Sequence, residues 1–297
     1  MNGMAEAVLK RPYLILLLTA LFWGGNAVAG KAAVGVVPPM MLSFLRWAIA
    51  GTTLLVFARG EIDRDAKTIR ASLAWLVAMG ALGFGAFNLL LYSAVHHTTA
   101  INVAIEQSAM PMLIVAANFL FFRETIGWML AAGVVLSLVG VMVIAAHGDL
   151  GALLGADVNR GDAMMLVAVA LYAGYSVALR KRPKLHWASF LAVLSLSAAA
   201  ASLPFMIAEF IAGARIRPGA EAALLILYVS LFPSFFAQLF YARGVELIGA
   251  NRAGLFINLV PLFGSALAIL FLGERLEFYH LVGYGLVVVG LIAAQRR

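Results

Sequence analysis

Cysteine is absent from this 297-residue sequence, and charged residues are scarce at 12%. Without cysteine, the chain has no disulfide, no thiolate metal site and no cysteine nucleophile. Soluble domains carry about twice this share of charged residues. Because 64% of the residues are hydrophobic, polar side chains are too few to cover a folded surface, and we expect most of that surface to face lipid.

Long apolar runs separated by short polar breaks fill the sequence. A helix of about 20 apolar residues crosses the hydrocarbon layer, whereas a transmembrane β-barrel needs segments of about ten residues with alternating hydrophobicity. The runs fit the first description, so we predict an all-α integral membrane protein. Its ten transmembrane helices are expected at residues 13–33, 39–58, 70–94, 99–121, 126–146, 161–180, 187–211, 220–242, 248–271 and 277–295.

Sequence motifs for nucleotide or metal chemistry are incomplete. Residues 25–32 fit the first part of a phosphate-binding loop, but Ala32 stands where a serine or threonine should bind magnesium, and the segment lies in an apolar run. The H-E-x-x-H zinc motif does not occur. We therefore expect no enzymatic activity, no cofactor, no metal site and no requirement for an ATPase subunit.

The net charge of +7 could suggest a nucleic-acid partner, but the positions of the cations suggest membrane orientation instead. Most of the 21 lysines and arginines fall in alternate polar breaks, on one side of the predicted bundle. Cytoplasmic loops carry such an excess. We therefore predict a multi-pass protein of the inner cell membrane, surrounded by lipid, with both termini in the cytoplasm and no nucleic-acid partner.

One stretch of the chain occurs twice, at an offset of 150 residues: Glu124 and Glu274 stand at matching positions, together with a proline and two glycines. The similarity extends to the start of each half, so the repeat is a five-helix unit. Because five is odd, the second copy enters the membrane from the opposite side, as in many secondary transporters. The predicted domains are a first five-helix repeat at 1–146, a periplasmic linker at 147–160 and a second, inverted five-helix repeat at 161–297.

Two charged side chains fall inside predicted helices. Arg46 and Glu106 lie at similar distances from the same side of the predicted bundle, so we expect them at similar depth. One interpretation is a structural ion pair between two helices. The other is functional, with Glu106 as a proton-responsive carboxylate or as a contact for a substrate ammonium group.

Polar residues recur at helical spacing on six of the predicted helices, so each set shares one helix face. Taken singly, each residue could serve only as a hydrogen bond between helices. Taken together, the six stripes predict a lined substrate cavity. Its predicted residues are Trp23, Asn26, Asn88, Tyr92, Asn102, Glu106, Tyr172, Tyr175, Ser176, Ser234, Gln238, Tyr241 and Asn258.

Four prolines, Pro111, Pro204, Pro233 and Pro261, lie inside predicted helices. Proline removes a backbone hydrogen bond and kinks a helix, so we predict a kink at each position. Pro111 and Pro261 correspond across the repeat. Their kinks belong either to the moving parts of the protein or to a plain packing bend.

These features resemble the EamA type of the drug/metabolite transporter superfamily. The resemblance rests on the W-G-x-N segment at 23–26, on Arg46, and on a P…LFxxE signature at 111–124 and 261–274. It implies ten helices in two inverted repeats. Within this family the sequence is most similar to the YddG group, which implies export of aromatic and other neutral amino acids.

The sequence therefore predicts a monomeric carrier that moves small amino-acid-like metabolites by alternating access. Export is implied only by the resemblance, and proton coupling and facilitated diffusion both stay open. Another metabolite or a drug-like cation is the alternative substrate, and a channel or a membrane receptor is the alternative class. In the second repeat Ala173 replaces Trp23 and Leu196 replaces Arg46, so the repeat does not imply a symmetric site.

Overall fold

Helices form all the secondary structure in the described part of the computed structural model, which comprises residues 9–123, 127–149, 159–249, 253–254 and 256–295. Two short segments are π-helical, η1 (Gly80–Ala86) and η3 (Phe232–Phe236), and two are 3₁₀-helical, η2 (Leu179–Lys181) and η4 (Phe256–Leu259). The α-helices are α2 (Pro12–Ala32), α3 (Pro39–Phe57), α4 (Arg59–Ala71), α5 (Leu73–Met79), α6 (Phe87–Ala94), α7 (Ala100–Gln107), α8 (Met110–Phe122), α9 (Trp128–Ala145), α11 (Arg160–Ala178), α12 (Trp187–Ile211), α13 (Ala220–Leu231), α14 (Ala237–Ile248), α16 (Val260–Leu272) and α17 (Phe278–Gln295).

Several of these helices are long and apolar enough to span a membrane, which confirms the predicted all-helical, multi-pass class. Among the described residues, seven spans meet this test, and the bent pair α7 and α8 makes an eighth. α16 and α17 belong to shorter apolar helices. Large apolar side chains point outward, with Phe57 and Phe278 each 79% exposed and Trp128 76% exposed. A surface of this composition suits lipid rather than water.

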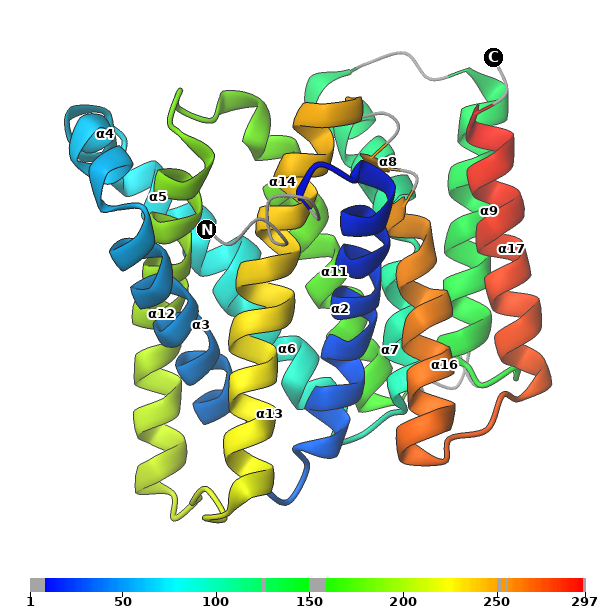
Figure 1. Ribbon diagram of the computed structural model, residues 1–297. Helices are drawn as coiled ribbons and strands as arrows, with labels where there is room; N and C mark the ends of the chain where they lie inside the picture. Colours follow the sequence, from blue (N-terminus) through cyan, green and yellow to red (C-terminus); the bar gives the residue numbers. More distant parts are fainter. Residues whose placement is uncertain (1–8, 124–126, 150–158, 250–252, 255, 296–297) are drawn as a thin grey trace.

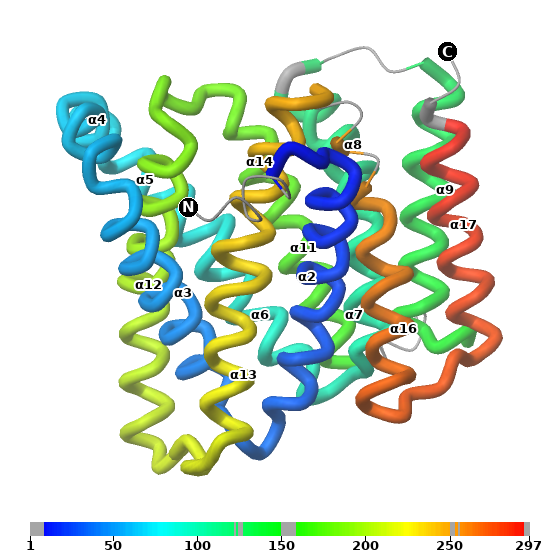
Figure 2. Tube along the Cα trace, viewed as in Figure 1, coloured from blue at the N-terminus to red at the C-terminus, as the bar shows by residue number. Residues whose placement is uncertain are grey.

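α2 runs through the middle of the bundle, and α14 and α16 pack against it. α9 lies along α17 at one edge of the bundle, and α3 lies along α12 toward the other edge (Figure 1). The tube view shows the same pairs side by side (Figure 2). Glycines permit the closest approach, because a Cβ added at Gly24 would lie 2.7 Å from the backbone nitrogen of Gly264. The core therefore joins helices that are far apart in the sequence.

Element bounds recur at the 150-residue offset seen in the sequence. α8 and α16 both end in a left-handed residue, Arg123 with φ 53° and Gly273 with φ 67°. α9 and α17 begin at Trp128 and Phe278, and η1 and η3 occupy matching places in their spans. Glycine adopts the left-handed conformation without steric cost, whereas Arg123 keeps it as a non-glycine residue. The two halves thus share local structure even where their residues differ.

The predicted helix at 99–121 is two helices, α7 and α8, which meet at an angle of 42°. Pro111 lies in the first turn of α8, and Pro261 lies in the first turn of α16. Pro233 lies at the start of the π-helical segment η3. A first turn needs no N–H from proline, so Pro111 and Pro261 begin α-helical segments instead of kinking one from inside.

α4 occupies a segment that the sequence analysis left mostly as a connection. None of its residues is buried, and it lies at the upper edge of the bundle in Figure 1. Arg64 Nη1 donates to Glu61 Oε1 at 2.8 Å, and the N–H of His186 donates to Asp65 Oδ2 at 2.9 Å. Charge pairs three residues apart stabilise a solvated helix, and a search for long apolar runs does not detect such a helix.

Candidate functional site

A buried network around Arg46 joins three helices of the bundle; we call Asn26, Arg46, Asn88 and Tyr92 the arginine network. Arg46 Nη1 donates to Asn26 Oδ1 at 2.5 Å, to Asn88 Oδ1 at 2.8 Å and to Tyr92 Oη at 2.5 Å. Tyr92 Oη also donates to Asn26 Oδ1 at 2.9 Å. None of the four residues is more than 7% exposed. One positive charge is thus held among neutral oxygens inside apolar helices.

The local sequence positions each member of this network. Asn88 and Tyr92 are one turn apart on α6, so they share a face, and Asn88 Nδ2 donates to the carbonyl of Phe84 in η1 at 2.9 Å. Asn26 stands in a run of small residues on α2. A Cβ added at Gly30 would lie 2.8 Å from the Tyr92 ring. Small residues on α2 therefore let the ring of Tyr92 approach that helix.

Arg46 and Glu106, which the sequence placed at similar depth, do not pair. Arg46 bonds to the arginine network, while neither carboxylate oxygen of Glu106 has a hydrogen-bond partner among the described residues. Glu106 is fully buried on α7, and α7 packs on α2, α9, α11, α16 and α17. The structural ion pair, one of the two interpretations of the sequence, does not form. Similar depth does not place two side chains on facing sides of their helices.

A second polar cluster lies where α9 ends and α11 begins, at the lower face of the bundle in Figure 1. We call Thr98, Asn102, His147, Asp162 and His280 the histidine network. Thr98 Oγ1 donates to Asp162 Oδ1 at 2.5 Å, and Asn102 Nδ2 lies 3.2 Å from the same oxygen. His147 Nε2 lies 3.5 Å from Asp162 Oδ2. The described residues contain no group of three or more acidic, histidine or cysteine side chains placed to hold a metal ion.

The hydrogen bonds fix the tautomer of His280 and the orientation of Asn102. The backbone N–H of Glu277 donates to His280 Nδ1 at 2.8 Å, so Nε2 carries the proton and donates to Asn102 Oδ1 at 2.8 Å. Asn102 Nδ2 is left to donate toward Thr98 Oγ1 at 3.0 Å, and it lies 3.2 Å from both Asp162 Oδ1 and His147 Nε2. Neutral His147 therefore accepts from Asn102, whereas protonated His147 would donate to Asp162.

Most of this network was not predicted from the sequence. Asn102 is a predicted cavity residue, but the other polar residues carried no signal because they stand at helix ends. His147 and Asp162 flank the predicted linker, and His280 lies near the start of α17. Burial is the property that singles out Asp162 and His280, each no more than 1% exposed. The central part of the predicted linker, residues 150–158, lies outside the described residues, as does Glu124.

Carboxylates from the second half of the chain cap helices of the first half. Glu274 accepts hydrogen bonds from the N–H groups of Ala100 and Ile101 at the start of α7. Glu209 Oε2 accepts from the N–H of Met41 at the start of α3, at 2.9 Å. A helix N-terminus favours a negative charge. These caps therefore hold the lower face of the bundle together.

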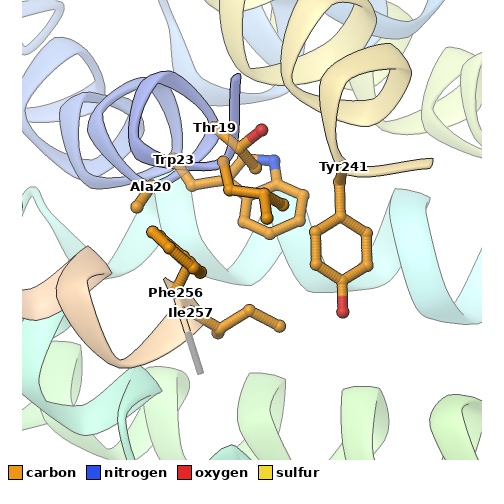
Figure 3. Close-up of a pocket in the computed structure, with 7 residues that line it drawn as sticks. Thr19, Ala20, Trp23, Tyr241, Phe256 and Ile257 are labelled. Carbon is orange, nitrogen blue, oxygen red and sulfur yellow. The ribbon is translucent and has the colours of Figure 1, made fainter. Parts of the chain in front are cut away.

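An aromatic recess lies along α2, nearer the start of that helix than Asn26 (Figure 3). It lies between α2, α14 and η4, and its side chains are packed too closely to admit a water molecule. The ring of Trp23 lies 5.4 Å from that of Tyr241, and Trp23 Nε1 donates to the carbonyl of Pro233 at 3.1 Å. The residues that line the recess are Leu16, Thr19, Ala20, Trp23, Tyr241, Phe256 and Ile257. The structure thus brings two predicted cavity residues, Trp23 and Tyr241, together.

Aromatic rings continue from the arginine network toward α11. Trp47 stacks on Phe84 at 4.7 Å, and Phe84 lies 5.8 Å from Tyr175. Tyr172 lies 5.3 Å from Phe87. The predicted residues Tyr172 and Tyr175 therefore belong to an aromatic wall between α6, α11 and η1.

The other predicted cavity residues make local contacts. Ser176 Oγ donates to the carbonyl of Tyr172, and Ser234 Oγ donates to that of Val229. Gln238 is half-buried on α14 and makes no side-chain hydrogen bond to a described residue. Asn258 accepts from Tyr284 Oη only through its backbone oxygen. None of these four side chains joins the arginine network.

A model of the EamA-like transporter family matches residues 10–146 and again residues 159–294. A crystal structure has the same fold over 96% of both chains, with a TM-score of 0.65 and 19% identity. The uncharacterized transporter YyaM of Bacillus subtilis is 21% identical over 95% of this chain and 92% of its own length. A probable amino-acid metabolite efflux pump of Salmonella typhimurium is 24% identical over 95% of this chain and 94% of its own length.

Proposed function

The chain belongs to the EamA-like transporter family, and on that premise we propose that it is a monomeric carrier that moves small amino-acid-like metabolites across the inner membrane by alternating access. The observation that carries this proposal is the arginine network. It places a charge, two amides and a phenol inside apolar helices. Polar groups at such depth mark substrate pathways in membrane proteins.

Alternating access would use the two halves as inverted repeats of five helices, with both termini in the cytoplasm. The recurrence of helix bounds at 150 residues supports a duplicated unit. The lower face would be the periplasmic one. Caps and the histidine network join the two halves there, so this arrangement fits a state that is closed on that side.

Amino-acid-like substrates, with export as the direction, are supported by two observations. The aromatic wall and the aromatic recess offer rings to an apolar side chain. The relative from Salmonella typhimurium is named for amino-acid metabolite efflux. The cavity would comprise the arginine network, the wall and the recess, and Glu106, which is buried without a hydrogen-bond partner, would serve in proton coupling.

Transport by the purified protein in proteoliposomes tests this proposal. Uptake of radiolabelled L-phenylalanine and L-leucine is measured with and without unlabelled substrate inside, and with and without a pH gradient. A carrier gives saturable uptake that rises when the vesicles are preloaded. Flux that neither saturates nor responds to preloading would indicate a channel. Absence of flux for every amino acid would remove this substrate class and leave another metabolite or a drug-like cation.

A further inference from the structure

Arg46 carries a charge that no described side chain neutralises. Its hydrogen-bond partners are two amides and a phenol. The ion pairs among the described residues join other groups, Arg64 to Glu61, His147 to Asp162 and Arg243 to Glu246. Arg46 is only 4% exposed, so bulk solvent does not screen its charge in this state.

Two nitrogen atoms of the Arg46 guanidinium group, Nε and Nη2, make no hydrogen bond to a described residue. All three hydrogen bonds converge on Nη1, Nε is buried without a partner, and Nη2 makes no hydrogen bond to a described residue. The Nε–H and Nη2–H bonds of a guanidinium point the same way and match the two oxygens of one carboxylate. Because Nη1 is anchored to α2 and α6, the free fork has a fixed direction.

Aromatic rings face this charge. Arg46 Cζ lies 4.6 Å from the centre of the Trp47 ring and 5.8 Å from that of Tyr92. Such contacts stabilise a cation without neutralising it. The surroundings of Arg46 therefore combine one cation, neutral amides and apolar rings.

We propose that the substrate supplies the missing negative charge, and that Arg46 binds the carboxylate of the substrate through Nε and Nη2. This inference rests on the proposed carrier function and names the group that the site recognises. One guanidinium without a second described cation beside it matches a single carboxylate. The neighbouring rings match an aromatic or branched apolar body. The substrate class is thus a monocarboxylate with an apolar side chain, of which a neutral amino acid is one form.

An acidic residue placed beside Arg46 should compete with the substrate. Asn26 Oδ1 accepts from Arg46 and Tyr92, while Asn26 Nδ2 donates to no described residue. Asn26→Asp therefore keeps both contacts and adds an internal carboxylate. If Arg46 has only a structural role, Asn26→Asp should leave ligand binding and transport unchanged and should leave the protein as stable as the wild type or more stable. A carboxylate-binding role predicts a stable protein that binds its substrate poorly.

The experiment compares ligands that differ only in the carboxylate. L-Phenylalanine is paired with L-phenylalaninamide, and 3-phenylpropionate is paired with 3-phenylpropanamide. Exchange in proteoliposomes and the ligand-induced rise in unfolding temperature are both measured. The variants are Asn26→Asp, Arg46→Gln and Arg46→Lys, with Asn26→Ser as the uncharged control at the same position and Arg64→Gln as an exposed arginine control.

We expect the wild type to prefer the carboxylate of each pair. Asn26→Asp and Arg46→Gln should weaken carboxylate binding by about tenfold or more, while Arg46→Lys keeps part of it. Asn26→Ser, which adds no charge, should weaken it less than Asn26→Asp, and Arg64→Gln should keep the preference unchanged. Stabilisation by 3-phenylpropionate alone, lost in Asn26→Asp, supports the site even where no amino acid is exchanged, and then only the amino-acid proposal fails. Equal responses to acid and amide in both pairs, or unchanged carboxylate binding in a well-folded Asn26→Asp protein, would overturn the inference and leave the carrier proposal standing.

Discussion

Glu274 Oε1 accepts the backbone N–H of Ala100 at 2.8 Å, so a side chain of the second half of the chain caps a helix of the first half. Its other oxygen accepts the N–H of Ile101 at 3.0 Å. The positive end of α7 thereby meets a negative charge. Any movement of α7 away from this loop at the lower face must break both bonds.

The first prediction concerns this cap. Glu274→Gln removes the charge and turns one acceptor into a donor, so we expect the cap to weaken by about 1 kcal/mol. A cysteine in place of the buried Ile101 reports opening, because the chain has no cysteine of its own. Its labelling by a membrane-impermeant maleimide should be severalfold faster in Glu274→Gln. Glu277→Gln, an exposed glutamate of the same loop, should leave the rate unchanged, and equal rates in both variants would contradict the role of the cap.

A second prediction concerns glycines that look alike in the sequence. A Cβ added at Gly140 would lie 2.5 Å from the carbonyl oxygen of Gly283, whereas nothing lies within 4 Å of one added at Gly285. Gly140→Ala should force α9 and α17 apart and lower stability by about 1–3 kcal/mol. Gly285→Ala should be neutral or stabilising by up to about 1 kcal/mol. Thermal unfolding in detergent measures both, and a Gly140→Ala protein as stable as Gly285→Ala would contradict the packing described for this pair.

Much of the fold could be predicted from the sequence, because apolar runs of membrane length have few alternatives. The bend between α7 and α8 could be predicted only in part. Pro111 indicates a kink in this run, but Ser108 and Ala109, where the helix breaks, carry no strong helix-breaking signal. α4 was missed because its polar composition also suits a loop. The apolar runs thus predict where the membrane spans lie, but they do not predict the residue at which each helix begins or breaks.

The site was predicted only in part, for a geometric reason. Helical spacing correctly grouped Asn88 with Tyr92, because residues on one helix share a face by their spacing. It did not reveal which face of α7 meets which neighbour. Arg46 and Glu106 share a depth, yet Arg46 faces α2 and α6, and Glu106 follows Asn102 along α7. Rotation of one helix against another is a property of packing, which a single sequence does not record.

The third prediction concerns Glu106. Its two oxygens are buried without hydrogen-bond partners, so a neutral glutamine should be accepted without loss of thermal stability. Coupling through this carboxylate predicts that a pH gradient stimulates uptake by the wild type and not by Glu106→Gln. Glu246→Gln serves as the control, because Glu246 forms an exposed pair with Arg243. A gradient effect of full size in Glu106→Gln would refute the role in coupling.

The fourth prediction concerns the pH dependence of stability near the lower face. Partial burial, followed by the charges of His97 and Lys31, lowers the pKa of His96. The folded protein therefore binds fewer protons at this residue than the unfolded chain does. Its contribution to stability is complete above the ordinary histidine pKa and is lost as the pH falls.

The control for this effect is His96→Gln, whose unfolding temperature should depend less on pH in the same range. Thermal unfolding in detergent measures both proteins. An identical pH profile in wild type and variant would contradict the lowered pKa of His96.

Paired cysteine reporters test alternating access of the two faces of the protein. Ile101→Cys reports the lower face, and Thr19→Cys, two turns into α2, reports the aromatic recess that Thr19 lines. Each is labelled in membranes at a series of L-phenylalanine concentrations and in the Glu274→Gln background. Alternating access predicts opposite changes, with labelling at position 19 falling whenever labelling at position 101 rises. Labelling that rises at both positions together would show a continuous pathway and contradict a carrier.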